Sequence, residues 1–217
     1  MGIARVAVTL TAAACAVVVG MTTAVASPAS APEPEVGILT PEAEAEVNAR
    51  LEQSKPVIAL YKGRQINLAD GWQGAQACTE VPSGKVYCYD STEEADAALP
   101  TIDPSAAARK LPGAAFGPTA FSDCSSPYFC LFESGNGAGR RLQWSADGTK
   151  QLADWDFRDK ASSACVVRPL GGALVYDART GLPDPYMALG NLACYNFIDV
   201  GYPTGGSWND KADYVEL

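Results

Sequence analysis

The sequence contains no histidine, so cysteines and carboxylates are the side chains of this chain best suited to catalysis or metal binding. Without an imidazole the chain cannot build Ser-His-Asp or Cys-His catalysis, or a histidine metal site. Asp154 and Asp156 form a close carboxylate pair of the kind that glycosidases use. Proximity in sequence does not set the separation which that chemistry needs, so a solvated loop is the plainer interpretation. We therefore expect binding and not catalysis.

Six cysteines follow the N-terminal segment that contains Cys15: Cys78, Cys88, Cys124, Cys130, Cys165 and Cys194. An even number in an exported chain predicts three disulfides, and the number alone leaves their connectivity open. A zinc site is the alternative, but it would need reduced thiolates and would have no histidine ligand. Local geometry predicts Cys78–Cys88, because a chain folded about the turn Pro82-Ser83-Gly84 brings these two cysteines opposite each other.

The N-terminal segment has the order of a secretory signal peptide: the basic Arg5, an apolar run from residue 6 to 21, and small residues. We expect cleavage after Ala26, which removes residues 1–26; a cut after Ala31 would leave Pro32 next to the bond. A membrane anchor is the alternative, but the run is short for a span of about 20 residues. We predict a secreted, extracellular protein with no membrane association after cleavage. Its formal net charge of −9 argues against a nucleic-acid partner.

The chain divides, by composition, into a leader and short helix over 27–55, a small hairpin module over 56–99, a linker over 100–122 and a domain over 123–217. Residues 27–39 are rich in Pro, Ala and Glu and are expected to be disordered. Thr40 and Pro41 predict a helix over 41–53. In the module, strands are expected at 57–61 and 65–68, followed by the 78–88 hairpin and a helix that ends near Leu99.

The last domain is expected to be all-β. Strand-like runs at 128–133, 140–144, 164–170 and 173–177 are separated by glycine-rich turns. Asp159-Lys160-Ala161 is repeated as Asp210-Lys211-Ala212, 51 residues later, and each copy precedes a strand. A period that recurs only twice indicates a duplicated unit, which favours a Greek-key sandwich or barrel.

Several motifs in this domain resemble the βγ-crystallin-like domains, and specifically the Streptomyces metalloproteinase inhibitor family. They are Cys124 with the strand Tyr128–Glu133, the glycine-rich hairpin 136–139 with the strand 140–144, Leu152–Trp155 and Arg158–Ser163. The resemblance, which involves nothing before residue 122, implies a βγ-crystallin-like double Greek key for 123–217. With the small disulfide-tied α+β module that the residues before it predict, the whole chain is expected to be mainly β. The resemblance implies a secreted peptidase inhibitor that docks a rigid loop, with a secreted endopeptidase as partner and metalloproteinases as the leading target class. An extracellular structural or weakly calcium-binding module is the alternative.

The resemblance also suggests specific sites. The family's short leading loop implies Cys124–Cys130, which leaves Cys165–Cys194 as the third pair. The family's inhibitory bond lies in a second short cysteine loop that this chain lacks, so we expect the inhibitory contact near Cys165-Val166 or in the Cys124–Cys130 loop.

The crystallin calcium motif aligns with 158–163 and 209–214, where Ser162 and Asp213 occupy the Ser/Thr ligand position. No cofactor is expected to be required, and any calcium binding should be weak. The alternative is that these are turns whose side chains bond nearby backbone amides. Arg140 and Arg141 should lie on opposite faces of a solvated strand. Trp144, Trp155 and Trp208 are expected in the core.

Overall fold

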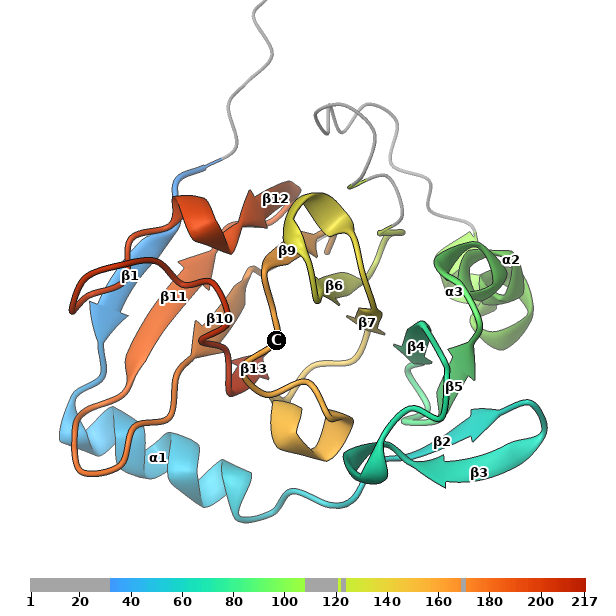
Figure 1. Cartoon of the computed structure of the whole chain (residues 1–217), viewed down its shortest axis with the longest axis horizontal. Helices are drawn as coiled ribbons and strands as arrows, with labels where there is room; N and C mark the ends of the chain where they lie inside the picture. Colours follow the sequence, from blue (N-terminus) through green and yellow to red (C-terminus); the bar gives the residue numbers. More distant parts are fainter. Residues whose placement is uncertain (1–31, 108–120, 122–123, 169–170) are drawn as a thin grey trace, which may run out of the picture.

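The computed structural model describes residues 32–107, 121, 124–168 and 171–217 (Figure 1). It is a mixed α/β structure with two β-sheets, three disulfides and short helices. The expected signal peptide 1–26, both expected cleavage sites, and residues 108–120 of the expected linker lie outside the described residues.

The five-stranded sheet has the order β1 (Glu35–Ile38), β11 (Pro185–Leu189), β10 (Ala173–Tyr176), β13 (Tyr214–Glu216) and β8 (Thr149–Gln151). The eight-stranded sheet has the order β12 (Ala193–Asn196), β9 (Ser163–Val166), β6 (Phe129–Phe132), β7 (Arg141–Trp144), β4 (Ala77–Glu80), β5 (Val86–Tyr89), β2 (Ile58–Tyr61) and β3 (Arg64–Asn67). Neighbouring strands are antiparallel, except that β2 is parallel to β5 and β4 is parallel to β7.

The two halves of the C-terminal region exchange a strand. In the first half, β6, β7 and β9 lie in the eight-stranded sheet, whereas β8 pairs with β13 in the other sheet. In the second half, β10, β11 and β13 lie in the five-stranded sheet, whereas β12 pairs with β9. Each half therefore completes its sheet with a strand from the other half.

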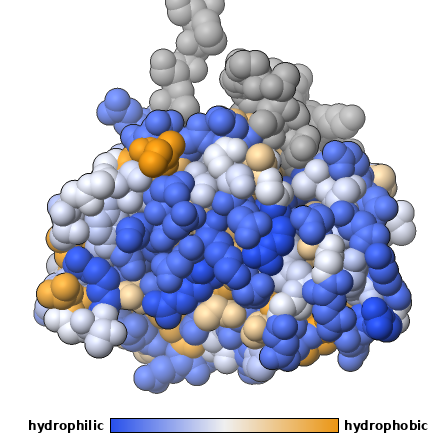
Figure 2. All heavy atoms as spheres, in the orientation of Figure 1, coloured by the Kyte–Doolittle hydropathy of each residue, from blue (hydrophilic) through white to orange (hydrophobic). Residues whose placement is uncertain are grey.

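The main hydrophobic core draws side chains from both sheets and from the N-terminal module. Trp144, Trp155 and Trp208 are all buried in it, which confirms their expected role. Trp72 of the module joins them, and its indole Nε1 donates to the Trp155 carbonyl oxygen at 2.7 Å. The module and the C-terminal region therefore share one core. In Figure 2 the visible face is largely hydrophilic, with small apolar patches.

The N-terminal leader is more ordered than its composition predicted. Residues 35–38 were expected to be disordered, and this was wrong, because they form β1 and pair with β11. The pairing partner lies some 150 residues away in sequence, so local composition gave no sign of it. The following helix is confirmed as α1 (Pro41–Leu51), and the Thr40 hydroxyl caps it by accepting from the Ala43 amide at 3.3 Å.

The start of the expected linker is helical. Helix α2 (Thr92–Ile102) continues through Pro100, and α3 (Pro104–Ala107) follows it. The Ser91 side chain caps α2 as its sequence predicts, by accepting from the Glu94 amide at 3.2 Å. The parallel pairing of β4 with β7 continues one sheet across the expected boundary. The division into a module and a separate inhibitor domain stays a prediction.

Arg141 begins β7, whereas Arg140 lies in the bend just before it, so the two do not share a strand, and the expected solvation was also wrong. The Arg141 side chain is fully buried and its Nη2 lies 2.6 Å from Oδ1 of Asp96 in α2. Arg140 stacks over the Trp72 ring at 4.6 Å and bonds to Glu133. Both arginines therefore tie the module to the C-terminal region. None of the described helices is long and apolar enough to cross a membrane.

Candidate functional site

All three expected disulfides are present: Cys78–Cys88, Cys124–Cys130 and Cys165–Cys194. The first and third join residues that face each other on antiparallel strands, with Cα atoms 4.1 Å apart. The third connects β9 of the first half to β12 of the second, so it locks the exchanged strand in place.

The Cys165–Val166 bond does not lie in an exposed loop, and here our expectation was wrong. Both residues are 0% exposed. They belong to β9, which is hydrogen-bonded to β6 on one edge and to β12 on the other. A peptidase could not reach this bond without dismantling the sheet. The apolar run Ala164–Val167 is that of a strand buried on both faces, which explains its composition.

The Cys124–Cys130 loop is also a poor contact surface. Cys124, Ser126 and residues 128–130 are buried, and only Ser125 and Pro127 are partly exposed. The Tyr128 hydroxyl donates to the Asp103 carboxylate at 2.7 Å, so the loop packs against the end of α2. Neither of the two loops suggested by the resemblance is free to dock.

The repeated Asp-Lys-Ala turns contact each other. The Asp159 amide donates to the Ala212 carbonyl at 2.9 Å, and the Asp210 amide donates to the Ala161 carbonyl at 3.0 Å. Both aspartates have a left-handed backbone, with φ of 55° and 56°. The repeat in the sequence is thus a pair of equivalent turns at the junction of the two halves.

The two expected calcium ligands already have protein partners. The Ser162 hydroxyl donates to Asp210 Oδ1 at 3.1 Å. Oδ2 of Asp213 accepts from the Arg158 guanidinium at 3.0 Å and from the Ala178 amide at 2.7 Å. Burial raises the pKa of Asp213 to about 6, against the opposing effects of the Ala178 amide and the Arg158 charge. Among the described residues, no group of three or more Cys, Asp or Glu side chains is arranged to hold a metal ion.

Ala178 belongs to the loop 177–184, which joins β10 to β11 and was not predicted as a site from the sequence. We call it the hairpin loop. Its tip, residues 180–183, is exposed, and the Leu182 side chain is 58% exposed. Gly181 has φ of +74°, a conformation that glycine adopts without strain. The loop therefore presents one large apolar side chain at its tip.

Three carboxylates hold the base of this loop. Asp184, which is buried, accepts from the Arg179 amide at 2.7 Å and from the Tyr214 hydroxyl at 3.2 Å. Asp177 accepts from the Tyr202 hydroxyl, and Asp213 accepts from the Ala178 amide. We call Asp177, Asp184 and Asp213 the carboxylate clamp.

The groups around the clamp favour its hydrogen bonds. Burial and the nearby Asp184 charge raise the pKa of Tyr214, so its hydroxyl keeps the proton that it donates. The Arg179 guanidinium donates to the Pro183 carbonyl at 3.1 Å, across the neck of the loop. The exposed tip therefore extends from a base in which the Ala178 and Arg179 amides are hydrogen-bonded to carboxylates.

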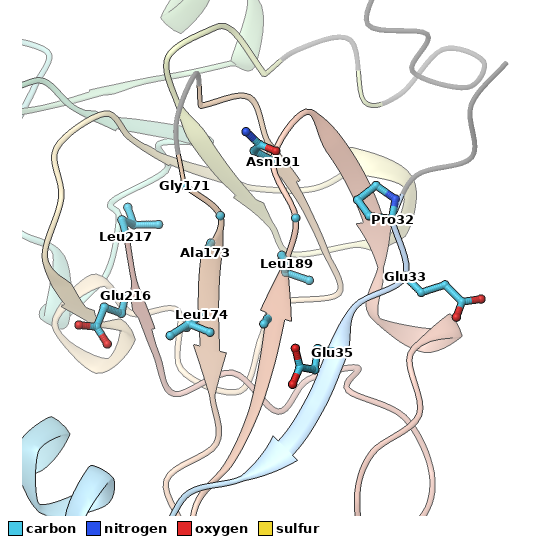
Figure 3. Close-up of a pocket in the computed structure, with 13 residues that line it drawn as sticks. Pro32, Glu33, Glu35, Gly171, Ala173, Leu174, Leu189, Asn191, Glu216 and Leu217 are labelled. Atoms are coloured by element: carbon cyan, nitrogen blue, oxygen red, sulfur yellow. The ribbon is translucent and has the colours of Figure 1, made fainter.

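A shallow groove of about 630 Å³ lies at the other end of the same hairpin (Figure 3). Its lining includes Leu174, Leu189 and Leu217, with Glu33, Glu35 and Glu216 around them. The groove is bounded by the start of β10 and the end of β11, whereas the hairpin loop joins the opposite ends of these strands. It is therefore a separate feature from the loop.

The comparison with known families concerns the region that ends in this loop. Residues 117–180 match peptidase inhibitor family I36. This is the Streptomyces metalloproteinase inhibitor family, so the resemblance is confirmed over that segment. No curated protein and no solved structure matches the chain.

The family I36 segment indicates an inhibitor and not an enzyme, and implies a peptidase as partner. It includes β6 to β10 and ends at Thr180, inside the hairpin loop. Leu182 and Asp184 follow directly. A sequence signal for them was present, since a lone leucine between Gly181 and Pro183, in a turn flanked by two aspartates, has no place in a core.

Proposed function

We propose that the protein is a secreted peptidase inhibitor that docks a rigid loop into its target, with metalloproteinases as the leading target class. The family I36 match is the observation that carries the proposal. Secretion is supported by the signal-like N-terminus, for which we propose cleavage after Ala26, and by the three disulfides.

We propose the hairpin loop as the contact surface, in place of the two disulfide loops. Leu182 would fill an apolar pocket of the peptidase, since removing its exposed apolar surface from water favours binding. A loop that is already held loses little conformational entropy on docking. The bonded Ala178 and Arg179 amides supply this preorganisation. The carboxylate clamp thus holds the loop in one conformation, as a disulfide across the base of a loop would.

The fold that we propose for the C-terminal region is the double Greek key of the βγ-crystallin-like domains. The strand orders β7-β6-β9-β12 and β11-β10-β13-β8 support it. In each of them three strands come from one half and the fourth is lent by the other half. The reciprocal contacts of the Asp159 and Asp210 turns give the same two-fold relation at the level of single hydrogen bonds.

A weakly calcium-binding extracellular module is the second candidate. The Ser162–Asp210 contact favours it, because it places a hydroxyl and a carboxylate from different halves together. Against strong binding, the Arg158 guanidinium occupies the Asp213 carboxylate. We propose that calcium binds weakly at best and is not required for inhibition.

The test is inhibition of a panel of secreted endopeptidases, beginning with a thermolysin-like metalloproteinase and including serine and cysteine peptidases. We expect the wild type to inhibit the metalloproteinase and Leu182→Ala to weaken inhibition by roughly tenfold or more, because each buried methylene contributes about 0.8 kcal/mol. Leu192→Ala is the matched control, because Leu192 is 49% exposed but follows the far end of β11. No inhibition of any peptidase at micromolar protein would overturn the proposal in favour of the structural module.

A further inference from the structure

Residues 35–51 pack against the hairpin that carries the loop, although they lie outside the family I36 segment. We call them the N-terminal strap. Figure 1 shows β1 alongside β11, with α1 at the foot of the same strands.

The strand of the strap reaches the base of the hairpin loop directly. β1 pairs with β11 from Glu35↔Ala188 to Ile38↔Pro185. The next residue, Leu39, donates its amide to the Asp184 carbonyl at 2.8 Å. The Tyr186 ring packs over Gly37, where a Cβ would lie 2.6 Å from the outer end of that ring, so a larger residue would displace the ring. The strap is therefore fitted to this hairpin.

The helix of the strap reaches the same aspartate by a second route. Val47, which is 3% exposed, packs in a small cluster with Tyr176 and Tyr214. The two tyrosine rings are stacked with centroids 4.6 Å apart. The Tyr214 hydroxyl donates to Asp184 Oδ2. Thus α1 supports the ring whose hydroxyl orients the Asp184 carboxylate.

Asp184 transmits both contacts to the loop. Its backbone carbonyl accepts a hydrogen bond from the Leu39 amide of the strap, and its Oδ2 accepts one from the Tyr214 hydroxyl. Its Oδ1 accepts from the Arg179 amide, two residues before the exposed glycine. Asp184 is therefore the member of the carboxylate clamp that connects the strap to the loop.

We propose that the N-terminal strap is a positioning element of the inhibitor, which acts through Asp184 to hold residues 180–183 in the docking conformation. The inference rests on the proposed function for its consequence, but its structural part can be measured without a peptidase. Loosening the strap should loosen the loop while the rest of the fold remains.

Two strap variants test this in the full chain. Gly37→Val displaces the Tyr186 ring that packs over β1, and Val47→Ala removes packing under Tyr214. Val86→Ala is the matched control for the second variant, since Val86 is also buried, at 6% exposed, but lies in β5. Hydrogen exchange at the Ala178 and Arg179 amides reports on the loop in the free protein.

We expect exchange at these amides to rise at least tenfold in Gly37→Val, by a smaller factor in Val47→Ala, and not at all in Val86→Ala. The inhibition constant should rise in the same order. Unchanged exchange in both folded strap variants would overturn the proposal, as would unchanged inhibition by them where the wild type inhibits. If the wild type inhibits nothing, the proposed function fails, and the exchange result still decides whether the strap holds the loop.

Discussion

Two hairpins of this protein are held closed by different kinds of bond. The β4–β5 hairpin is closed by the Cys78–Cys88 disulfide, and its exposed tip, residues 82–85, carries no large apolar side chain. The β10–β11 hairpin has no cysteine at its neck and is closed by the carboxylate clamp, and its tip presents Leu182. A covalent bond needs two residues, whereas the clamp needs donors from several distant segments. The second hairpin is therefore the one whose shape depends on the rest of the fold.

Removing residues 1–122, which contain the first hairpin, the rest of its module and the N-terminal strap, should have the largest effect. We expect residues 123–217 to fold when oxidised, as the proposed domain division requires, but with a free energy of unfolding lower by roughly 5 kcal/mol. Trp72, Leu68 and Tyr61 are buried in the shared core, and each large apolar side chain contributes about 1.5–3 kcal/mol. Denaturant unfolding measures the loss. A fragment that stays unfolded would contradict the proposed division, because the C-terminal region would then need the segments before residue 123 to fold.

Removing the central member of the clamp should come next. Asp184→Ala leaves the Arg179 amide and the Tyr214 hydroxyl without their acceptor, which we expect to cost about 2–3 kcal/mol and to weaken inhibition. Asp184→Asn retains one carbonyl acceptor and should lose less. Unfolding curves and inhibition constants measure both effects.

The disulfide hairpin supplies the control for that variant. Cys78→Ala combined with Cys88→Ala should lower stability by about 2–4 kcal/mol. Inhibition should nevertheless be retained at temperatures where this variant is folded. Equal losses of inhibition in the two variants would mean that the loop responds to general destabilisation and not to its clamp.

The clamp should respond to pH where the disulfide does not. The pKa of Asp213 is raised to about 6, so the native state binds this proton more tightly than the unfolded chain does. Its contribution to stability is complete below the ordinary value near 4 and is lost as pH rises through about 6. We expect a loss on the order of 1 kcal/mol after solvent screening. Unfolding at pH 4 to 8 should show a flatter profile for Asp213→Asn, and identical profiles would contradict the assignment.

Calcium should produce the smallest effect. An ion at Asp213 would compete with Arg158 and with the Ala178 amide of the hairpin loop. We expect a dissociation constant in the range of about 0.1–1 mM common for extracellular modules, and stabilisation below about 1 kcal/mol at calcium concentrations near that value. Calorimetry on the wild type and Asp213→Ala measures it. Tight binding that survives the substitution would show that the ligands lie elsewhere.

Local signals in the sequence predicted local structure well. The caps at Thr40 and Ser91 marked where two helices begin, and the cysteines around the Ser83 turn gave the register of β4 and β5. The Asp159 and Asp210 repeat correctly marked two equivalent turns. Each of these features depends on residues close together in the chain or on an evident repeat.

Features formed by distant residues were not predicted. β1 was missed because its pairing with β11 leaves no mark in a Pro- and Glu-rich segment. Val166 was read as part of a strand and also as a docking site, and only the positions of β6 and β12 on its two sides exclude the second role. The clamp joins residues 177, 184 and 213 to tyrosines elsewhere, so no spacing rule could identify it.

The exchanged strands have a consequence for the time the protein needs to fold. β8 can pair only when β13 is in place, and β9 gains its second neighbour only when β12 is in place. Neither sheet can therefore form completely from one half of the C-terminal region alone. Contacts between residues so far apart in sequence are slow to form, because the chain loses entropy before they repay it. Until then, the edges of β9 and β13 that later pair with β12 and β8 are open to pairing with other chains. Cys165 and Cys194 face each other only once β12 pairs with β9, so formation of this disulfide would mark the late step at which the open edge of β9 is covered.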